Sequence, residues 1–239
     1  MKKILKEGFT YKLLRKLKNS FNLLILPDSI AVLKDEQKKI RTQVIKLVKD
    51  NAGLVLDIGS GNRPASNFSK IIKMDIDPGC PVDIVADAHN IPFLKNTFDL
   101  VWLGGVLEHI KKPEMAIREI HRVTRKDGYI YIEAPFFQRI HGAPDDFQRF
   151  TISGIEELCS QFSKIKSGII CGPSSAFAHI FRSYLALCLS FDNNTLHHIL
   201  YYYILGWITL PIKYLDLILS KFKNAESISF AFYYLGRKE

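Results

Sequence analysis

The sequence is poor in cysteine and has none of the close cysteine pairs that build metal sites. Its 239 residues include four cysteines, scattered along the chain at Cys80, Cys159, Cys171 and Cys188. Without a Cys-x-x-Cys pair, neither a zinc site nor a disulfide scaffold is indicated, and a reducing cytoplasmic setting is expected. The apolar content of 47% excludes a disordered chain.

A secretory signal is also missing from the pattern. Pro27 and Asp28 interrupt the one early apolar run, and no small-residue cleavage site follows it. Acidic residues are scarce in the same region, where residues 1–18 hold seven Lys or Arg and one acid, Glu7. Apolar positions over 2–25 recur at helical spacing, which predicts a basic amphipathic helix. Such a helix is typical of a membrane surface, and the alternative is a helix packed on its own domain with a solvated basic face.

No later apolar stretch makes a convincing transmembrane helix. Residues 177–189 would form about 20 Å of helix, against roughly 30 Å of hydrocarbon in a bilayer. Residues 196–219 are interrupted by Pro211, Lys213 and Asp216. We therefore predict that 175–222 is a hydrophobic helical hairpin lying at a membrane interface. A lid and a dimer interface are the alternatives, so a homodimer stays open.

Strands and helices alternate through most of the remaining chain. The pattern predicts a parallel sheet that is completed after the hairpin, which gives a doubly wound, mostly parallel seven-stranded α/β fold. The expected strands are 54–58, 70–76, 82–86, 98–103, 129–133, 164–170 and 228–234, and the expected helices are 33–50, 114–123 and 151–162. Three parts follow from this reading: a basic helical region (1–50), a cofactor-binding domain (51–174 with 223–239) and the hairpin insertion (175–222).

A glycine loop follows the first expected strand, but it lacks the third glycine of a dinucleotide site. Gly59 and Gly61 allow a tight turn and a close approach of a nucleotide-like ligand to the backbone. Pro64 occupies the sixth place of the Gly-x-Gly-x-x-Gly pattern, so a dinucleotide cofactor is not favoured.

Several motifs in sequence order point to a different cofactor. They are Leu-Asp-Ile-Gly-Ser-Gly at 56–61, Met-Asp-Ile-Asp at 74–77, Ala-Asp-Ala-His-Asn-Ile-Pro-Phe at 86–93, Phe-Asp-Leu-Val at 98–101 with Leu-Glu-His-Ile at 107–110, and Glu-Ile-His-Arg-Val at 119–123 with Asp-Gly at 127–128. With them, residues 53–170 resemble the class I S-adenosylmethionine-dependent methyltransferases, in particular the type 11-like family. The resemblance implies a Rossmann-like fold, methyltransferase activity and S-adenosylmethionine as cofactor.

The resemblance also implies roles for individual residues. Asp57 would bind the cofactor's ammonium, and Asp75 its ribose hydroxyls, with Asp77 as the second choice. Asp87 would accept from the adenine amino group. The other expected cofactor-binding residues are Gly59, Ser60, Gly61, Ile76, Ala88 and Gly104. Arg63 departs from the family, which often has glycine at that position; it either reaches a carboxylate or phosphate or lies on the surface.

Two groups of residues are candidates for the chemistry. Glu108 and His109 are similar to a metal-binding motif of ubiquinone O-methyltransferases, but Gly105 stands where its first glutamate would fall. We therefore predict no metal, and either a catalytic role or a bracing role for this pair. Residues 141–151 resemble the His-x-x-Pro-x-Asp-Tyr-x-Arg-Phe-Thr segment of methyltransferases from surface-polysaccharide gene clusters.

That second segment supplies the expected acid–base groups. His141 is the candidate general base, Asp146 would orient it or bind a sugar hydroxyl, and Arg149 would bind substrate. The alternative is an Asp146–Arg149 pair that structures the loop.

Together these features predict an enzyme that O-methylates a sugar of a lipid-linked or surface glycan. It would be cytoplasmic and peripheral on the inner face of the membrane, where its basic segment meets an anionic surface. The alternatives are a methyltransferase for a lipid-soluble small molecule such as a quinone, and a non-catalytic cofactor-binding protein. Nucleic acid is not expected as a partner, because no Asn/Asp-Pro-Pro-Tyr motif follows the fourth strand.

Overall fold

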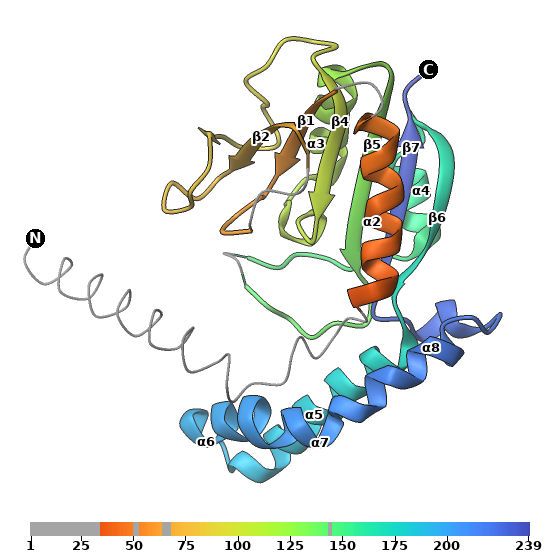
Figure 1. The fold of residues 1–239 in the computed structure, drawn as a ribbon. Coiled ribbons are helices and arrows are strands. Elements are labelled where there is room, and N and C mark those ends of the chain that lie inside the picture. The colour runs from red at the N-terminus through yellow and green to blue at the C-terminus, as the bar shows by residue number, and fades with distance from the viewer. Residues whose placement is uncertain (1–33, 50–52, 64–67, 143–144) are drawn as a thin grey trace, which may run out of the picture.

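A computed structural model describes residues 34–49, 53–63, 68–142 and 145–239 (Figure 1). The amphipathic helix expected over 2–25 lies outside these residues. The described chain forms one sheet with helices on both faces, and a helical hairpin lies beyond one edge of that sheet.

The sheet has the doubly wound order that the sequence predicts. Its seven strands run in the order β3-β2-β1-β4-β5-β7-β6, and β7 is antiparallel to both of its neighbours while the other pairs are parallel. The strands are β1 (Leu54–Ile58), β2 (Lys70–Asp75), β3 (Ile84–Val85), β4 (Phe98–Gly104), β5 (Thr124–Pro135), β6 (Ser163–Cys171) and β7 (Ala231–Arg237). The carboxyl ends of β1, β2, β4 and β5 therefore meet at one edge, where ligands bind in such sheets.

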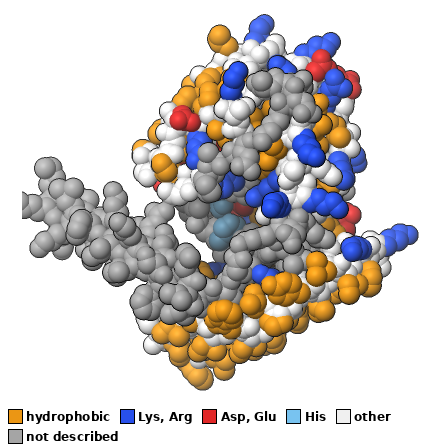
Figure 2. Space-filling model, in the orientation of Figure 1, with side chains coloured by type: hydrophobic (Ala, Val, Ile, Leu, Met, Phe, Trp, Pro, Cys, Tyr) orange, Lys and Arg blue, Asp and Glu red, His pale blue; other side chains and the backbone are white. Residues whose placement is uncertain are grey.

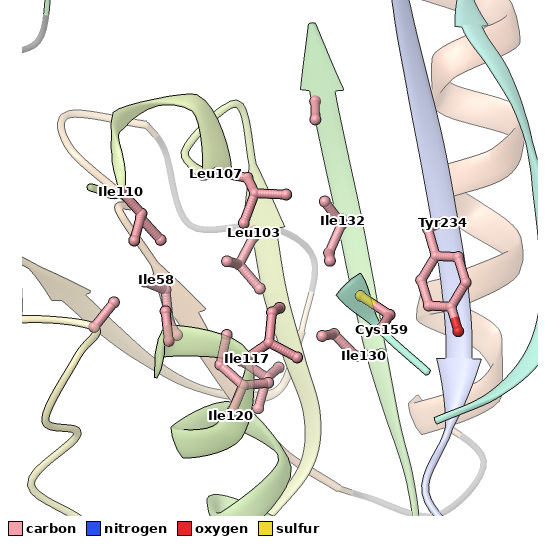
Figure 3. Close-up of a cluster of buried hydrophobic side chains, with 14 of the residues drawn as sticks. Ile58, Leu103, Leu107, Ile110, Ile117, Ile120, Ile130, Ile132, Cys159 and Tyr234 are labelled. Carbon is pink, nitrogen blue, oxygen red and sulfur yellow. The ribbon is translucent and has the colours of Figure 1, made fainter. Parts of the chain in front are cut away.

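Helices bury the two faces of the sheet in separate cores. On one face α2 (Lys34–Lys49) packs Val44 and Val48 against β1, β4 and β5. On the other face α3 (Pro113–Val123) and α4 (Ile152–Leu158) cover the larger core drawn in Figure 3. Because α3 turns its apolar residues inward at helical spacing, Ile117 and Ile120 lie fully buried beneath β4 and β5.

Several boundaries differ from the sequence-based expectation: β3 is shorter than 82–86, and α4 ends at Leu158 instead of 162. The strand expected at 129–133 begins at Thr124 and absorbs the Asp127-Gly128 turn as an irregularity in its pairing with β4. Asp127 takes a positive φ of 64° there, a conformation that Asp tolerates better than most residues. The last strand begins at Ala231 instead of 228, because Ala225–Ile228 form the short 3-10 helix η4.

The hairpin crosses the carboxyl edge of the sheet (Figure 1). Its first arm is α5 (Pro173–Ser190). The return arm is a nearly unbroken succession: α6 (Asn194–Ile199), the π-helix η2 (Leu200–Ile204), α7 (Leu205–Thr209), the 3-10 helix η3 (Leu210–Leu215) and α8 (Asp216–Leu219). By length and composition this 26-residue arm, Asn194–Leu219, could cross a membrane, and it is the one helix of the described chain that could.

The interruptions seen in the sequence do not end this arm. Lys213 and Asp216 are buried, with 5% and 1% of their surface exposed. The Asp216 carboxylate accepts hydrogen bonds from the backbone of Ser174 and Ser175 and from the Ser175 hydroxyl, at 2.7 to 2.9 Å. An anion at a helix N-terminus is favoured by the free N–H groups and by the helix dipole, so Asp216 locks the two arms together.

Candidate active site

The glycine loop and the acid at the end of β2 form one hydrogen-bonded unit. Gly59 and Gly61 have positive φ values of 60° and 52°, and a Cβ on Gly59 would lie 2.5 Å from Val106. The Gly61 N–H donates to the Asp75 carboxylate at 2.8 Å, and the Asp77 N–H donates to its other oxygen at 3.0 Å. Asp75 therefore stands beside the loop, as the ribose-binding role requires, and each of its oxygens has a second lone pair free to accept.

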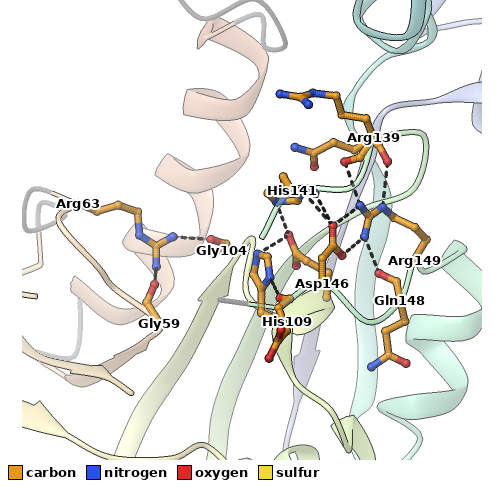
Figure 4. A network of polar contacts seen from close by, with 12 residues as sticks. Gly59, Arg63, Gly104, His109, Arg139, His141, Asp146, Gln148 and Arg149 are labelled. Carbon is orange, nitrogen blue, oxygen red and sulfur yellow. Dashed lines mark hydrogen bonds and ion pairs between the residues drawn. The ribbon is translucent and has the colours of Figure 1, made fainter. Parts of the chain in front are cut away.

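Arg63 fills the space at the end of β1. Its guanidinium lies 3.0 Å from the buried Asp57 carboxylate and donates to the carbonyls of Gly59 at 2.9 Å, Gly104 at 2.6 Å and Ser60 at 3.2 Å (Figure 4). Burial raises the pKa of Asp57, and the charge of Arg63 opposes that rise. The departure from the family pattern thus places a cation on Asp57, the residue expected to hold the cofactor's ammonium, and on three other residues expected to bind the cofactor.

The expected adenine end of the site is more open. Ile76 exposes 58% of its surface, while Ala88 is buried. Asp87 accepts from the backbone and ring of His89, at 2.9 and 2.6 Å. Partial burial opposes ionisation of Asp87, but these hydrogen bonds outweigh it and leave its pKa below the usual value.

One charged group at this edge of the sheet was not predicted from the sequence. Glu133, near the end of β5, receives two hydrogen bonds from Arg41 at 2.7 and 2.5 Å, one from Gln37 and one from the Tyr131 hydroxyl. These bonds tie α2 to the sheet beside the glycine loop. The sequence signal that could have identified Glu133 is a carboxylate close to the end of a buried strand.

The long loop after β5 is built on Asp146. Its carboxylate pairs with both terminal nitrogens of Arg149 and accepts the His141 N–H at 2.8 Å. Hydrogen bonds from Arg149 hold the pKa of Asp146 well below its usual range. Arg149 also donates to the carbonyls of Gln138, Arg139 and Gln148, so all five of its N–H groups are used within the loop (Figure 4). Arg149 therefore has no N–H group left to donate to a substrate, as its predicted role would require. The alternative, in which Arg149 structures the loop, accounts for all of its contacts.

His141, Glu108 and His109 meet beside this pair. Glu108 and His109 belong to the short 3-10 helix η1 (Leu107–His109) after β4. The Nε2 atoms of His141 and His109 lie 3.7 and 3.8 Å from Glu108 Oε1, and His141 Nδ1 lies 3.3 Å from Asp146. Phe147 donates its N–H to the Glu108 carbonyl at 2.9 Å, which fixes the loop against η1.

This cluster suits proton transfer. Burial lowers the pKa of His141 and raises that of Glu108, so His141 is neutral and able to accept a proton at neutral pH. His141 Nδ1 is buried without a hydrogen-bond partner, and the ionised Asp146 3.3 Å away favours a proton on it, which leaves Nε2 as the base. Glu108, His109 and His141 are also the one group of the described residues whose ligand atoms, all within 4.8 Å of one another, could hold a metal ion. His141 supplies the third ligand that the sequence pattern lacked.

Residues 56–132, which include the glycine loop, Asp75 and Glu108, match the family described as "Methyltransferase domain". The chain contains a class I S-adenosylmethionine-dependent methyltransferase domain. The expected family, fold and cofactor class are thereby confirmed for this domain.

Relatives of the methyltransferase domain are distant in sequence. A malonyl-[acyl-carrier protein] O-methyltransferase from Laribacter hongkongensis is 23% identical over 131 residues, which cover 43% of this chain and 44% of the relative. The chain thus matches less than half the length of that relative.

Solved structures share the fold over most of the chain. The [4+2]-cyclase SpnF has a TM-score of 0.53 at 18% identity and covers 90% of this chain and 86% of its own. A protein from Galdieria sulphuraria described as a sarcosine dimethylglycine methyltransferase has a TM-score of 0.52 at 12% identity, with coverage of 90% of this chain and 94% of its own. At these identities the likeness establishes the fold.

The residues of the methyltransferase domain fit the cofactor of its class. Asp75 offers free lone pairs beside the loop, and Ile76 offers an exposed apolar surface. The buried Ser60 hydroxyl has no hydrogen-bond partner. Asp57, Gly59 and Gly104 fit a cationic ammonium, because Arg63 already places a cation on all three.

Proposed function

We propose that the protein O-methylates a sugar hydroxyl of a lipid-linked or surface glycan at the cytoplasmic face of a membrane. The observation that carries this proposal is the position of His141. Its ring lies between Asp146 and Glu108 at the sheet edge that also holds the glycine loop, and the apolar hairpin lies beyond the same edge. A fold alone does not decide the chemistry, so the proposal depends on this site.

The chain's residues supply positioning and proton removal. S-Adenosylmethionine, when bound, supplies the methyl group. A sugar hydroxyl is a weak nucleophile until its proton is removed, and His141 Nε2 takes that proton while Asp146 stabilises the resulting imidazolium. Glu108 is nearly inaccessible to solvent, whereas the His141 side chain is 32% exposed and so remains within reach of an acceptor. The name of the Laribacter relative also states an oxygen acceptor.

The hairpin supports the membrane part of the proposal. Its outward side chains form a continuous apolar band along the lower rim in Figure 2. Nine large apolar residues of the hairpin expose more than half of their surface: Phe177, Tyr184, Leu187, Phe191, Ile208, Tyr214, Leu215, Ile218 and Phe222. Exposed apolar area of this extent marks an interaction surface. Lys221 and Lys223 are exposed where the hairpin ends, and the basic residues of 1–18 add a second attraction to anionic lipid.

The catalytic part is tested with labelled S-adenosylmethionine and fractionated cell-envelope material. We expect label in a lipid or glycan fraction, and His141→Ala should lower the rate by about 10²-fold or more. His121→Ala, on α3 away from the site, is the matched control. Binding of S-adenosylhomocysteine without label transfer to any fraction would contradict an enzymatic role and favour the non-catalytic alternative. Label in a lipid-soluble small molecule would favour a quinone-type acceptor.

The membrane part is tested by vesicle flotation. Leu187→Glu and Ile208→Glu each place a charge on an exposed apolar position that the proposal puts against lipid, so each should weaken binding to anionic vesicles by about fivefold or more. Leu94→Glu is the control, because Leu94 is 83% exposed but lies outside the hairpin. Equal vesicle binding by all three variants would refute docking through the hairpin. Extraction that requires detergent instead of salt would indicate a spanning arm.

A further inference from the structure

A cluster of cationic and hydrogen-bonding groups lies where the loop after β5 meets the hairpin. The Tyr201 hydroxyl of η2 is 2.6 Å from Arg182 Nη2, 3.2 Å from Arg139 Nε and 3.2 Å from His179 Nδ1. The guanidinium carbons of Arg182 and Arg139 lie 3.8 and 4.5 Å from the centre of the Tyr201 ring. Two like charges therefore share one phenol, and we call these four residues the Tyr201 cluster.

The cluster has no anion to balance it within the described part of the chain. Arg182 is only 2% exposed, and its Nε and Nη1 have no hydrogen-bond partner. No carboxylate of the described residues forms an ion pair with Arg182 or Arg139. Elsewhere the described arginines that reach into the fold are each paired with a carboxylate: Arg41, Arg63, Arg122 and Arg149. A buried unpaired charge is strongly unfavourable, so Arg182 stands out.

The unused atoms of the cluster are all donors. The Tyr201 hydroxyl has one proton, and it serves His179 Nδ1 while its oxygen accepts from the two arginines. His179 Nε2 is then an N–H, and it too is buried without a partner. Burial lowers the pKa of His179 to about 3, so its ring is neutral and adds a donor without adding charge. A site of positive charge and N–H donors alone is complementary to an oxyanion.

We propose that the Tyr201 cluster binds a phosphate group. Guanidinium groups match the geometry of phosphate oxygens, and a phosphate has enough oxygens to serve donors from three side chains. The cluster lies near the candidate base, because Arg139 is two residues before His141 and its carbonyl accepts from Arg149, the partner of Asp146, at 3.1 Å. Figure 4 shows the Arg139 side chain extending away from the Arg149 pair.

This position fits the phosphate of a lipid-linked sugar, a step that rests on the proposed function. The sugar hydroxyl would then lie at His141, the phosphate at the Tyr201 cluster and the lipid chain along the apolar band of the hairpin. Phosphate binding itself does not depend on methyl transfer.

The test is thermal unfolding of the full chain with inorganic phosphate or pyrophosphate, against chloride at equal ionic strength. A ligand that binds the folded state raises the melting temperature as its concentration increases. We expect that rise for the wild type and its loss in Arg182→Met. Because the substitution removes an unbalanced buried charge, the phosphate-free variant should melt no lower than the wild type. Arg118→Met removes an equal charge from an exposed site on α3 and should keep the phosphate response.

A second variant and two vesicle compositions distinguish the possible outcomes. If Arg182→Met does not fold, Arg139→Met at the exposed edge of the cluster should weaken phosphate binding at least fivefold by calorimetry. Tighter binding to phosphatidylcholine vesicles containing phosphatidic acid than to those containing phosphatidylserine would assign the ligand to a lipid phosphate. A response to soluble phosphate alone would assign it to a free phosphate compound. No response of the wild type to either source would overturn the inference, as would an unchanged response in both variants. Loss of S-adenosylhomocysteine binding with phosphate binding intact would count against the proposed function alone.

Discussion

Arg63 should compete with the cofactor for its own site. Its guanidinium contacts Asp57, which is expected to hold the ammonium of S-adenosylmethionine, and the carbonyls of Gly59 and Gly104, which are also expected to bind the cofactor. Both cations cannot use these acceptors together, so Arg63 must leave when the ammonium binds. Replacing Arg63 with alanine should therefore tighten cofactor binding.

The expected size follows from the contacts that Arg63 gives up. It makes four polar contacts of 2.6 to 3.2 Å, and about a third of its side chain is exposed, so solvent screens them. Such contacts contribute about 1 kcal/mol each, and fixing an arginine side chain costs up to about 2 kcal/mol of rotamer entropy. The net free energy that favours these Arg63 contacts is about 1–2 kcal/mol. Its removal in Arg63→Ala corresponds to a gain of roughly 5- to 30-fold in cofactor affinity.

Calorimetry with S-adenosylhomocysteine measures this gain directly. 5′-Methylthioadenosine lacks the amino-acid portion, so its affinity should be the same for the wild type and Arg63→Ala. Arg118→Ala on α3 controls for the lost charge. Weaker binding of S-adenosylhomocysteine by Arg63→Ala would refute the competition and show that Arg63 binds the carboxylate of the cofactor instead.

Three further predictions concern the ribose acid, pH and metal. Asp75→Asn should weaken S-adenosylhomocysteine binding about 10-fold or more in calorimetry, because a charged acceptor of two hydroxyls is lost; unchanged affinity would transfer the role to Asp77. His179 titrates near 6.5 when unfolded but at about 3 when folded, so between these values the unfolded chain binds the extra proton. Denaturant unfolding should thus show stability falling by up to about 1.4 kcal/mol per pH unit from 6.5 downwards, a slope that His179→Asn should lack in phosphate-free buffer. Dialysis against EDTA should leave methyl transfer within about twofold if His141 acts as a base; a loss restored by added Zn²⁺ or Mn²⁺ would instead assign Glu108, His109 and His141 as ligands.

The sheet and the cofactor loop could be predicted because local sequence determines them. An apolar run ending in Asp57, followed by Gly59 and Gly61, encodes both a buried strand and a turn with positive φ. The strand positions and the site acids Asp57 and Asp75 fall where the motifs place them. The contact between Arg63 and Gly104 could not be predicted, because it joins residues 41 positions apart through the path of the loop.

The hairpin shows how tertiary contacts change the meaning of a polar residue. In the sequence, Asp216 reads as an interruption of an apolar stretch. In the fold its carboxylate caps α5, and a Cβ on Gly172 would lie 2.5 Å from that carboxylate. The partner lies more than 40 residues away, so no local pattern announces the role. Some apolar positions of the same arm, such as Tyr201 and Leu205, pack with Ala186 of α5, and the membrane interface expected for the exposed ones stays a prediction.

Two arginines show most clearly that the role of a side chain depends on its hydrogen-bond and ion-pair partners in the fold. Arg149 and Arg182 are chemically the same, and each lies within four residues of an aromatic side chain in the sequence. Every N–H of Arg149 meets an acceptor inside one loop, which makes it a brace. Arg182, brought by α5 beneath Tyr201 and Arg139, keeps three N–H groups without an acceptor in a buried site. The free energy of a buried cation depends on its counter-ion. Arg149, whose N–H groups all have acceptors, therefore accounts for the shape of the loop. Arg182, whose buried N–H groups lack acceptors, implies a ligand.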